Sequence, residues 1–234
     1  MTGPSAIPSP NIWESPELYE LENLAVDRAG VIETAMREVQ DWAGLDVVDI
    51  GCGTGFHLPR FAATARSVVG VEPHPPLVER ARQRTADLPS VRVVRASAEA
   101  TTLPGAGVDL AHARWSYFFG PGCEPGLAEL DRVMRAGGVA FVVDNDATRS
   151  TFGSWFRRGL PRYDPEAVER FWRRHGWARR PLDIAWTFDS PADFARVLRI
   201  ELPPAVADEV VAREPDRRHV DYAVNLWWRR WGAA

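Results

Sequence analysis

The sequence predicts an α/β fold, with a doubly wound, mostly parallel sheet of seven strands and helices on both of its faces. Between residues 45 and 143, five short apolar runs alternate with segments in which apolar residues recur at helical spacing. A glycine cluster follows the first run, which is typical of a buried strand that turns sharply into a helix. Strands and helices that alternate in this way form right-handed βαβ units, and such units build parallel sheets.

The first 43 residues precede this alternation. Residues 1–16 are rich in Pro and Ser, and we expect no regular structure before about Glu14. From Pro16 to Trp42 the apolar residues recur at helical spacing, and Gly30 is expected to separate two helices. We expect residues 1–43 to form a helical lid on a domain that spans residues 44–234.

The strands of the alternating region are short and apolar along their length, which is typical of parallel strands that are buried on both faces. They are expected at Leu45–Ile50, Ser67–Val71, Val91–Ala96, Val108–Ala113 and Gly138–Val143. The helices between them are expected at Phe56–Ala65, Pro76–Thr85 and Pro125–Arg135.

The alternation stops after Asp146. Two aromatic-rich helices, expected at Thr151–Leu160 and Pro165–Gly176, would form a helical insertion after strand five, at about residues 148–178. The remaining elements are a strand, two helices and a last strand, expected at Arg180–Phe188, Pro191–Ile200, Ala205–Ala212 and Val220–Trp228. Because Trp227–Trp231 alternates poorly between polar and apolar residues, we expect the last strand at an edge of the sheet.

The composition is that of a globular protein, with 45% hydrophobic and 26% charged residues. The net charge is −4, which argues against a partner bound through a nucleic-acid backbone. Cys52 and Cys123 do not have the spacing of metal ligands, so no metal is expected. The sequence begins without a signal-peptide pattern, and no apolar run approaches the ~20 residues that span a bilayer. We therefore expect a cytoplasmic monomer or homodimer with no membrane partner.

The glycine cluster Asp49–Gly55 is the strongest indication of a ligand. A dinucleotide-binding loop would need glycine where Phe56 stands. A phosphate-binding P-loop would need a lysine, and all 28 basic residues of the chain are arginine. What remains is a loop that approaches some other ligand, or a tight turn between strand and helix that binds nothing.

With its preceding strand, the pattern D-x-G-x-G-x-G at Asp49–Gly55 resembles motif I of the class I S-adenosylmethionine-dependent methyltransferases. The resemblance implies a Rossmann-like fold and S-adenosyl-L-methionine as cofactor, with Asp49 orienting the loop or the ammonium group of the cofactor. It also implies that the loop passes under the methionine and ribose of the cofactor, with Gly51, Cys52, Gly53 and Gly55 as contacts.

Glu72 ends the second predicted strand, about twenty residues after the first glycine. At that separation a carboxylate lies beside the ribose in such folds, where it accepts hydrogen bonds from both hydroxyls. We expect Glu72 to be this ribose ligand, with Pro73 beside it, although a solvated glutamate at a strand end remains the alternative.

The resemblance continues from Leu45 to Asp144. Ser97, Ala98 and Glu99 stand where the family holds the adenine edge, and Ser97 departs from the aspartate of many members. Glu129–Gly138 resembles the family's helix and Gly-Gly turn into strand five.

Several other residues follow the predicted strands or belong to the lid. His57, Asp144 and Asp146 are candidates for a base or an acceptor contact, although packing and turn capping are alternatives. Arg114 is a candidate partner for a carboxylate of the cofactor or substrate. Tyr19, in the predicted lid, is a candidate contact to the cofactor. His112 is expected to be a core histidine.

These residues predict a methyltransferase that acts on the oxygen or nitrogen of a small molecule. RNA or DNA is the main rival acceptor, but Ala113–Tyr117 lacks the [DN]-P-P-[FYW] pattern of amino-methylating enzymes and the Pro-Cys of cytosine-ring enzymes. A protein acceptor remains open, and so does a module that binds the cofactor without turnover.

Overall fold

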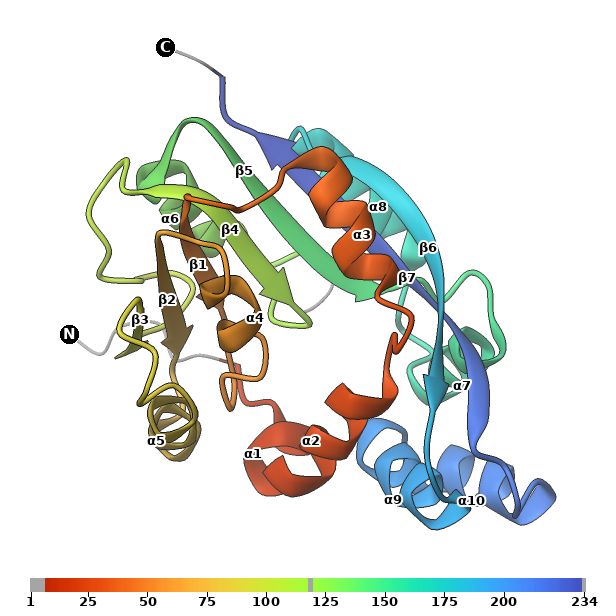
Figure 1. Ribbon diagram of the computed structural model, residues 1–234. Helices are drawn as coiled ribbons and strands as arrows, with labels where there is room; N and C mark the ends of the chain where they lie inside the picture. Colours follow the sequence, from red (N-terminus) through yellow and green to blue (C-terminus); the bar gives the residue numbers. More distant parts are fainter. Residues whose placement is uncertain (1–6, 118–119, 233–234) are drawn as a thin grey trace.

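The computed structural model describes residues 7–117 and 120–232. Its centre is one sheet of seven strands in the order β3-β2-β1-β4-β5-β7-β6 (Figure 1). The strands are β1 Asp46–Ile50, β2 Ser67–Glu72, β3 Val91–Arg95, β4 Val108–Arg114, β5 Met134–Asn145, β6 Ala178–Thr187 and β7 His219–Arg230. The first five are parallel, and β7 runs antiparallel to both of its neighbours. The α/β fold and the seven strands predicted from the sequence are confirmed.

The position of the last strand was predicted wrongly. Strand β7 lies between β5 and β6 rather than at an edge, with Phe141 of β5 opposite Trp228 and Ala178 of β6 opposite the same residue. The edge strand is β6, and Pro181, which has no N–H to donate, fits an edge position. Leu226 and Trp227 are buried because β7 has a partner on each side and helices on each face.

The helices of the first half connect the strands or precede them. They are α1 Pro10–Glu14, α2 Pro16–Ala25, α3 Val31–Val39, α4 Leu58–Ala62, α5 Pro75–Arg84 and α6 Glu124–Val133. Gly30 separates α2 from α3, as predicted. The short helix α1 contradicts the expectation of no regular structure before Glu14. Pro10 occupies its first turn, where a fixed φ and a missing N–H favour a helix.

The helices of the second half are α7 Thr151–Gly159, α8 Pro165–Arg174, α9 Pro191–Glu201 and α10 Pro204–Arg213. Helices α7 and α8 occupy the segment expected to be an insertion, and α9 and α10 form a second helical pair between β6 and β7. The aromatic side chains Phe152, Phe171 and Trp172 of α7 and α8 are buried in the core. None of the helices in the described ranges is long and apolar enough to cross a membrane.

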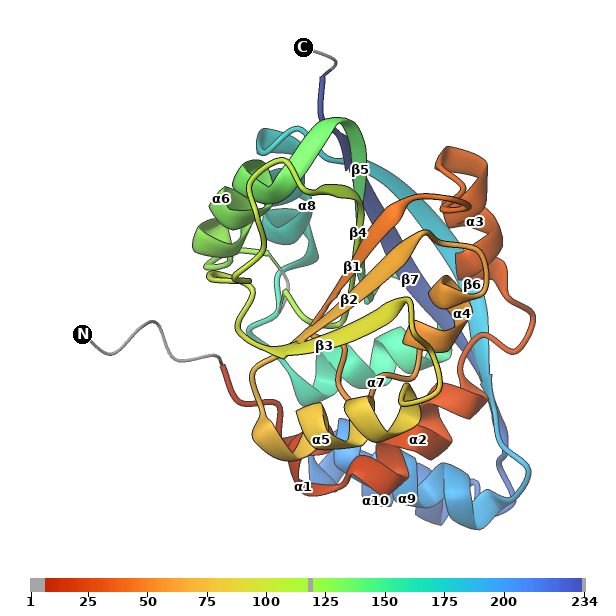
Figure 2. The same cartoon turned by 60° about the vertical axis from the view of Figure 1, so that its left-hand side comes forward.

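Two apolar clusters cover the two faces of the sheet. Phe141 and Val143 of β5 belong to one cluster, and the alternate residues Ala140 and Val142 belong to the other. Figures 1 and 2 both show α1, α2, α9 and α10 gathered at one end of the sheet, where the parallel strands β1, β2 and β4 end. Ligands of open α/β sheets bind at this end.

Candidate functional site

The glycine loop after β1 has a backbone that only glycine adopts readily. Gly51, Gly53 and Gly55 have φ of 71°, 56° and 79°, in the left-handed region. A Cβ on Gly51 would lie 2.5 Å from Cβ of Ser116, and a Cβ on Gly53 would lie 2.7 Å from Cδ1 of Ile12. The loop is therefore shaped for close approach by β4 on one side and by α1 on the other.

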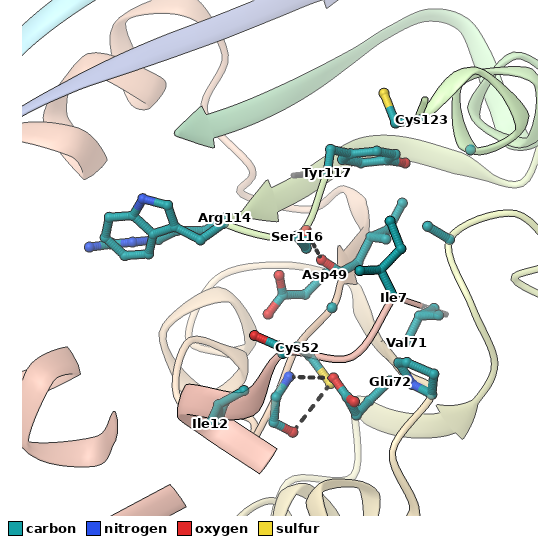
Figure 3. A pocket seen from close by; sticks show the side chains of 18 of the residues that line it. Ile7, Ile12, Asp49, Cys52, Val71, Glu72, Arg114, Ser116, Tyr117 and Cys123 are labelled. Carbon is teal, nitrogen blue, oxygen red and sulfur yellow. Dashed lines mark hydrogen bonds between the residues drawn. The ribbon is translucent and has the colours of Figure 1, made fainter. Parts of the chain in front are cut away.

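Glu72, at the end of β2, holds this loop. Its Oε2 accepts from the backbone N–H of Gly53 at 3.0 Å (Figure 3). Its Oε1 accepts from the backbone N–H of His74 at 2.9 Å. The side chain is only 4% exposed, and burial raises the pKa of the carboxyl while the two N–H groups counteract that shift. Each carboxylate oxygen has a second lone pair for a ligand.

Asp49 and His112 form a buried pair behind the loop. Nδ1 of His112 lies 2.7 Å from Oδ1 of Asp49, and both side chains are 3% exposed. The expectation that His112 is a satisfied core histidine is confirmed. The other oxygen of Asp49, Oδ2, is buried and has no hydrogen-bond partner among the described residues. This oxygen can therefore accept a hydrogen bond from a ligand in the adjacent cavity.

A cavity of about 150 Å³ opens at the ends of β1, β2 and β4. Most residues proposed for the cofactor line it, as does His57: Tyr19, Asp49, Gly51, Cys52, Gly53, Glu72, Pro73, Ala98, Glu99 and Arg114. Two do not. Gly55 packs against Ala81 of α5, and Ser97 forms an isolated bridge with Ala100.

Arg114 and His57 contribute the basic groups of this cavity. The guanidinium carbon of Arg114 lies 4.4 Å from the ring centroid of Trp115, and its Nε and Nη2 are buried without a hydrogen-bond partner in the described chain. Burial and the charge of Arg114 lower the pKa of His57 well below its usual range, so His57 is neutral at pH 7.

The N-terminal helices cover the cavity. The ring of Trp13 in α1 stacks on His74 at 4.4 Å. Arg84 of α5 donates to Oε2 of Glu20 in α2 at 2.6 Å and to Oγ1 of Thr54 in the glycine loop at 3.1 Å. These contacts fasten the N-terminal segment to the loop and to α5.

A second cavity of about 180 Å³ adjoins the first, and Ser9, Tyr19, Trp115 and Tyr117 line both. Its other walls come from α1, α2, β5, α7, α8, α9 and β7, and include Glu22, Asp144, Asn145, Phe156, Trp172, Glu201 and Tyr222. Glu22 and Glu201 were missed in the sequence. Each stands on the apolar face of its helix, Glu22 after Leu18 and Leu21, which was the signal that could have revealed them.

The two aspartates after β5 differ in surroundings. Asp146 accepts from Nη2 of Arg179 at 3.0 Å and from Nε of Arg149 at 3.2 Å, and it lines neither cavity. Asp144 lines the second cavity, and its Oδ1 accepts from Nε1 of Trp227 at 3.0 Å. Its Oδ2 is buried without a partner in the described residues, and burial raises the pKa of Asp144 to about 7.

Asp144→Asn is expected to change how stability depends on pH. Because its folded pKa lies above its unfolded value, Asp144 keeps a proton in the folded protein that the unfolded chain loses, so wild-type stability falls from about pH 4 to pH 7. Asp144→Asn carries no carboxyl group at this position, so its stability does not fall in this way. Its stability relative to the wild type should rise by about 2 kcal/mol between pH 5 and pH 8, measured by urea unfolding. The exposed Asp87→Asn should show no such change, and a pH-independent difference for Asp144→Asn contradicts the raised pKa.

Comparisons with known proteins identify the chain as a methyltransferase. Residues 47–138 match the family model described as a methyltransferase domain. An uncharacterized methyltransferase of Mycobacterium ulcerans is 34% identical over 143 residues, which are 57% of this chain and 52% of the relative. An uncharacterized 37.1 kDa transposon protein of Streptomyces fradiae is 31% identical over 135 residues, 56% of this chain and 39% of that protein. The chain thus spans about half or less of the length of these curated relatives.

Solved structures share the fold at low sequence identity. The YcgJ protein of Bacillus subtilis superposes with a TM-score of 0.64 at 15% identity, covering 88% of this chain and 100% of that one. A SAM-dependent methyltransferase of Aquifex aeolicus gives 0.58 at 16% identity, covering 91% and 97%. The [4+2]-cyclase SpnF gives 0.61 at 19% identity, covering 98% and 100%. A fold shared with a cyclase does not fix the reaction, so the function must be argued from the site.

Proposed function

We propose that this chain, which carries a class I S-adenosylmethionine-dependent methyltransferase domain at residues 47–138, transfers a methyl group from S-adenosylmethionine to a small molecule held in the second cavity. The observation that carries the proposal is the arrangement of Glu72 and the glycine loop beside an adjoining, enclosed cavity.

The first cavity has the groups that S-adenosylmethionine needs. Glu72 would accept from the ribose hydroxyls with the lone pairs that Gly53 and His74 leave free. The unpartnered Oδ2 of Asp49 suits the cofactor's ammonium group, and the unpartnered Nε and Nη2 of Arg114 suit its carboxylate. Glycine at Gly51 and Gly53 lets Ser116 and Ile12, which also line this cavity, approach the loop closely. Buried polar atoms without partners are rare in folded proteins, and those of Asp49 and Arg114 belong to residues that line the same cavity.

The adenine end would lie against the loop after β3. Ala98 and Glu99 line the cavity there, whereas Ser97, whose backbone pairs with Ala100, does not. We therefore assign the adenine contacts to Ala98 and Glu99, with Pro73 beside the ribose.

Helices α1 and α2 would act as the lid proposed for residues 1–43, of which 1–6 lie outside the described residues. Asp144, which has a pKa near 7 and lines the second cavity, is the proposed base. His57 lines only the first cavity and would contact the methionine end. Asp146, paired with Arg149 and Arg179, would support the turn after β5.

The reaction requires little beyond positioning and the removal of a proton. When bound, the cofactor supplies an electrophilic methyl group on a sulfonium. The enclosing walls hold the acceptor in line with that methyl group, which lowers the barrier by fixing orientation. The lid excludes water, and Asp144 accepts a proton from an acceptor hydroxyl or ammonium.

Calorimetry and labelling test this proposal. The protein is expected to bind S-adenosylmethionine and its demethylated product with micromolar dissociation constants, on the order of −8 kcal/mol. Incubated with methyl-labelled cofactor and fractionated cell extract, it should label a small molecule. Binding no tighter than millimolar contradicts the cofactor, and label found only in nucleic acid or protein contradicts the acceptor class.

A further inference from the structure

The second cavity has acidic walls that the proposed methyl transfer does not by itself explain. Glu22, Asp144 and Glu201 all line it. Glu22 and Asp144 are 4% exposed, and each has one carboxylate oxygen without a hydrogen-bond donor in the described chain. The indole N–H of Trp172, buried in the same wall, also has no partner. These carboxyl groups and this indole leave a buried, acidic wall with unsatisfied hydrogen-bonding atoms.

Glu22 and Glu201 lie against each other. Burial, the charge of Glu201 and a hydrogen bond with Glu201 raise the pKa of Glu22. The side-chain amide of Asn11 donates to Oε1 of Glu201 at 2.6 Å. Two carboxyls in such contact are stable only when they share a proton or a cation.

The helices that carry this pair add to its negative potential. Glu22 lies in the last turn of α2, and Glu201 is the last residue of α9. The C-terminal end of a helix carries partial negative charge and normally attracts basic residues. Two such ends therefore point their dipoles and their carboxyls at one cavity, which favours a positive group there.

The basic side chains nearby do not neutralise this cluster. Arg114 lies over the ring of Trp115 and forms no hydrogen bond to Glu22 or Glu201 among the described contacts. Arg179 is held by Asn225, Asp146 and Glu169. Three carboxyl groups thus line the cavity, and the guanidinium groups that act on them, Arg114 on Glu22 and Arg179 on Asp144, do so only through space.

Aromatic side chains form the rest of the wall. Trp115, Phe156, Trp172 and Tyr222 line the cavity, where their rings suit an apolar body and an exposed ring face attracts a cation. We propose that the methyl acceptor is a small amine, bound as its ammonium form by Glu22 and Glu201 with its apolar part against these rings. This inference rests on the proposed function and names the substrate class of that same site.

The chemistry balances without a further reagent. The ammonium loses one proton to a carboxylate of the cavity, and the neutral amine regains its lone pair. That lone pair forms the new N–C bond as the C–S bond of the sulfonium breaks, and the electron pair of that bond passes to sulfur. The product is a methylated ammonium beside a neutral thioether, and the protonated carboxyl later returns its proton to water.

Paired ligands test the proposal in the complex of the protein with demethylated cofactor. A series of amines from ethylamine to phenethylamine is compared by calorimetry with the corresponding alcohols. At least one amine is expected to bind about tenfold or more tightly than its alcohol, because the charge-assisted contact is lost in the alcohol. Binding should release about one proton, since an ammonium displaces the proton that Glu22 and Glu201 share. Heats measured in two buffers of different ionisation enthalpy give this number.

Glu22→Gln provides the matched variant. It should weaken amine binding about tenfold and abolish proton release, while alcohol and cofactor binding stay unchanged. Glu14→Gln, at the exposed end of α1, should behave as wild type. If Glu22→Gln fails to fold, the affinities of the paired amines and alcohols for the wild type and for Glu201→Gln still test the inference.

Three results overturn the inference: no amine of the series binds, alcohols bind as tightly as amines, or both glutamine variants bind amine as the wild type does. Each of these results leaves the proposed function intact if the demethylated cofactor still binds to the protein. Loss of cofactor binding in the wild type would instead contradict the proposed function itself.

Discussion

Glu72→Ala is expected to weaken the binding of S-adenosylmethionine about 10- to 150-fold, or about 1.5–3 kcal/mol, the value of a lost hydrogen bond to a charged group. The carboxylate has two tasks in the structure. It accepts from the N–H groups of Gly53 and His74, and its remaining lone pairs face the cavity. Alanine removes the ligand contact and also leaves two backbone donors without their acceptor.

The second loss should appear in the protein without cofactor. Leaving buried N–H groups unpaired costs on the order of 1–3 kcal/mol, so the free energy of unfolding should also fall. Calorimetry measures the affinity and urea unfolding measures the stability. Glu79→Ala, on the exposed side of α5, serves as the control for both. Unchanged affinity in Glu72→Ala would remove this residue from the site.

His112→Ala is expected to lower the free energy of unfolding by about 3–5 kcal/mol, because it leaves Asp49 buried with neither oxygen paired. It also removes a ring that packs against Phe61 and His57 at 5.1 and 5.6 Å between centroids. Urea unfolding at pH 7 measures the effect.

The exposed His219→Ala is the matched control and should change stability by no more than about 0.5 kcal/mol. Because the loop after Asp49 leads into the first cavity, His112→Ala should also weaken cofactor binding. A loss of stability below about 1 kcal/mol would mean that Asp49 finds another donor.

Local patterns predicted the parallel half of this fold well. The runs that became β1 to β5 are mostly apolar, and each is followed by a turn that the sequence marks with glycine or a polar residue. Such features depend on neighbours along the chain, so they can be read without the structure. The position of β7 could not be read this way, because the choice between an edge and an inner place depends on which strands pair with it.

The residues of the site also differ in whether they could be predicted from neighbours along the chain. Asp49, the glycines and Glu72 lie close in sequence to strand ends, and their spacing indicated a shared cavity. Glu22 and Glu201 are 179 residues apart, and only the packing of α2 against α9 brings them together. Their charge on an apolar helix face was visible, but its meaning depended on a tertiary contact.

The ion pairs that hold the N-terminal helices in place would also affect how fast ligands exchange. Ser9 and Tyr19 line both cavities, so one segment separates cofactor and acceptor alike from bulk water. That segment is tied down by ion pairs, Glu20 with Arg84 and Glu17 with Arg80. Dissolved salt screens these charges, so we expect raised ionic strength to loosen this segment and to speed the exchange of the proposed ligands.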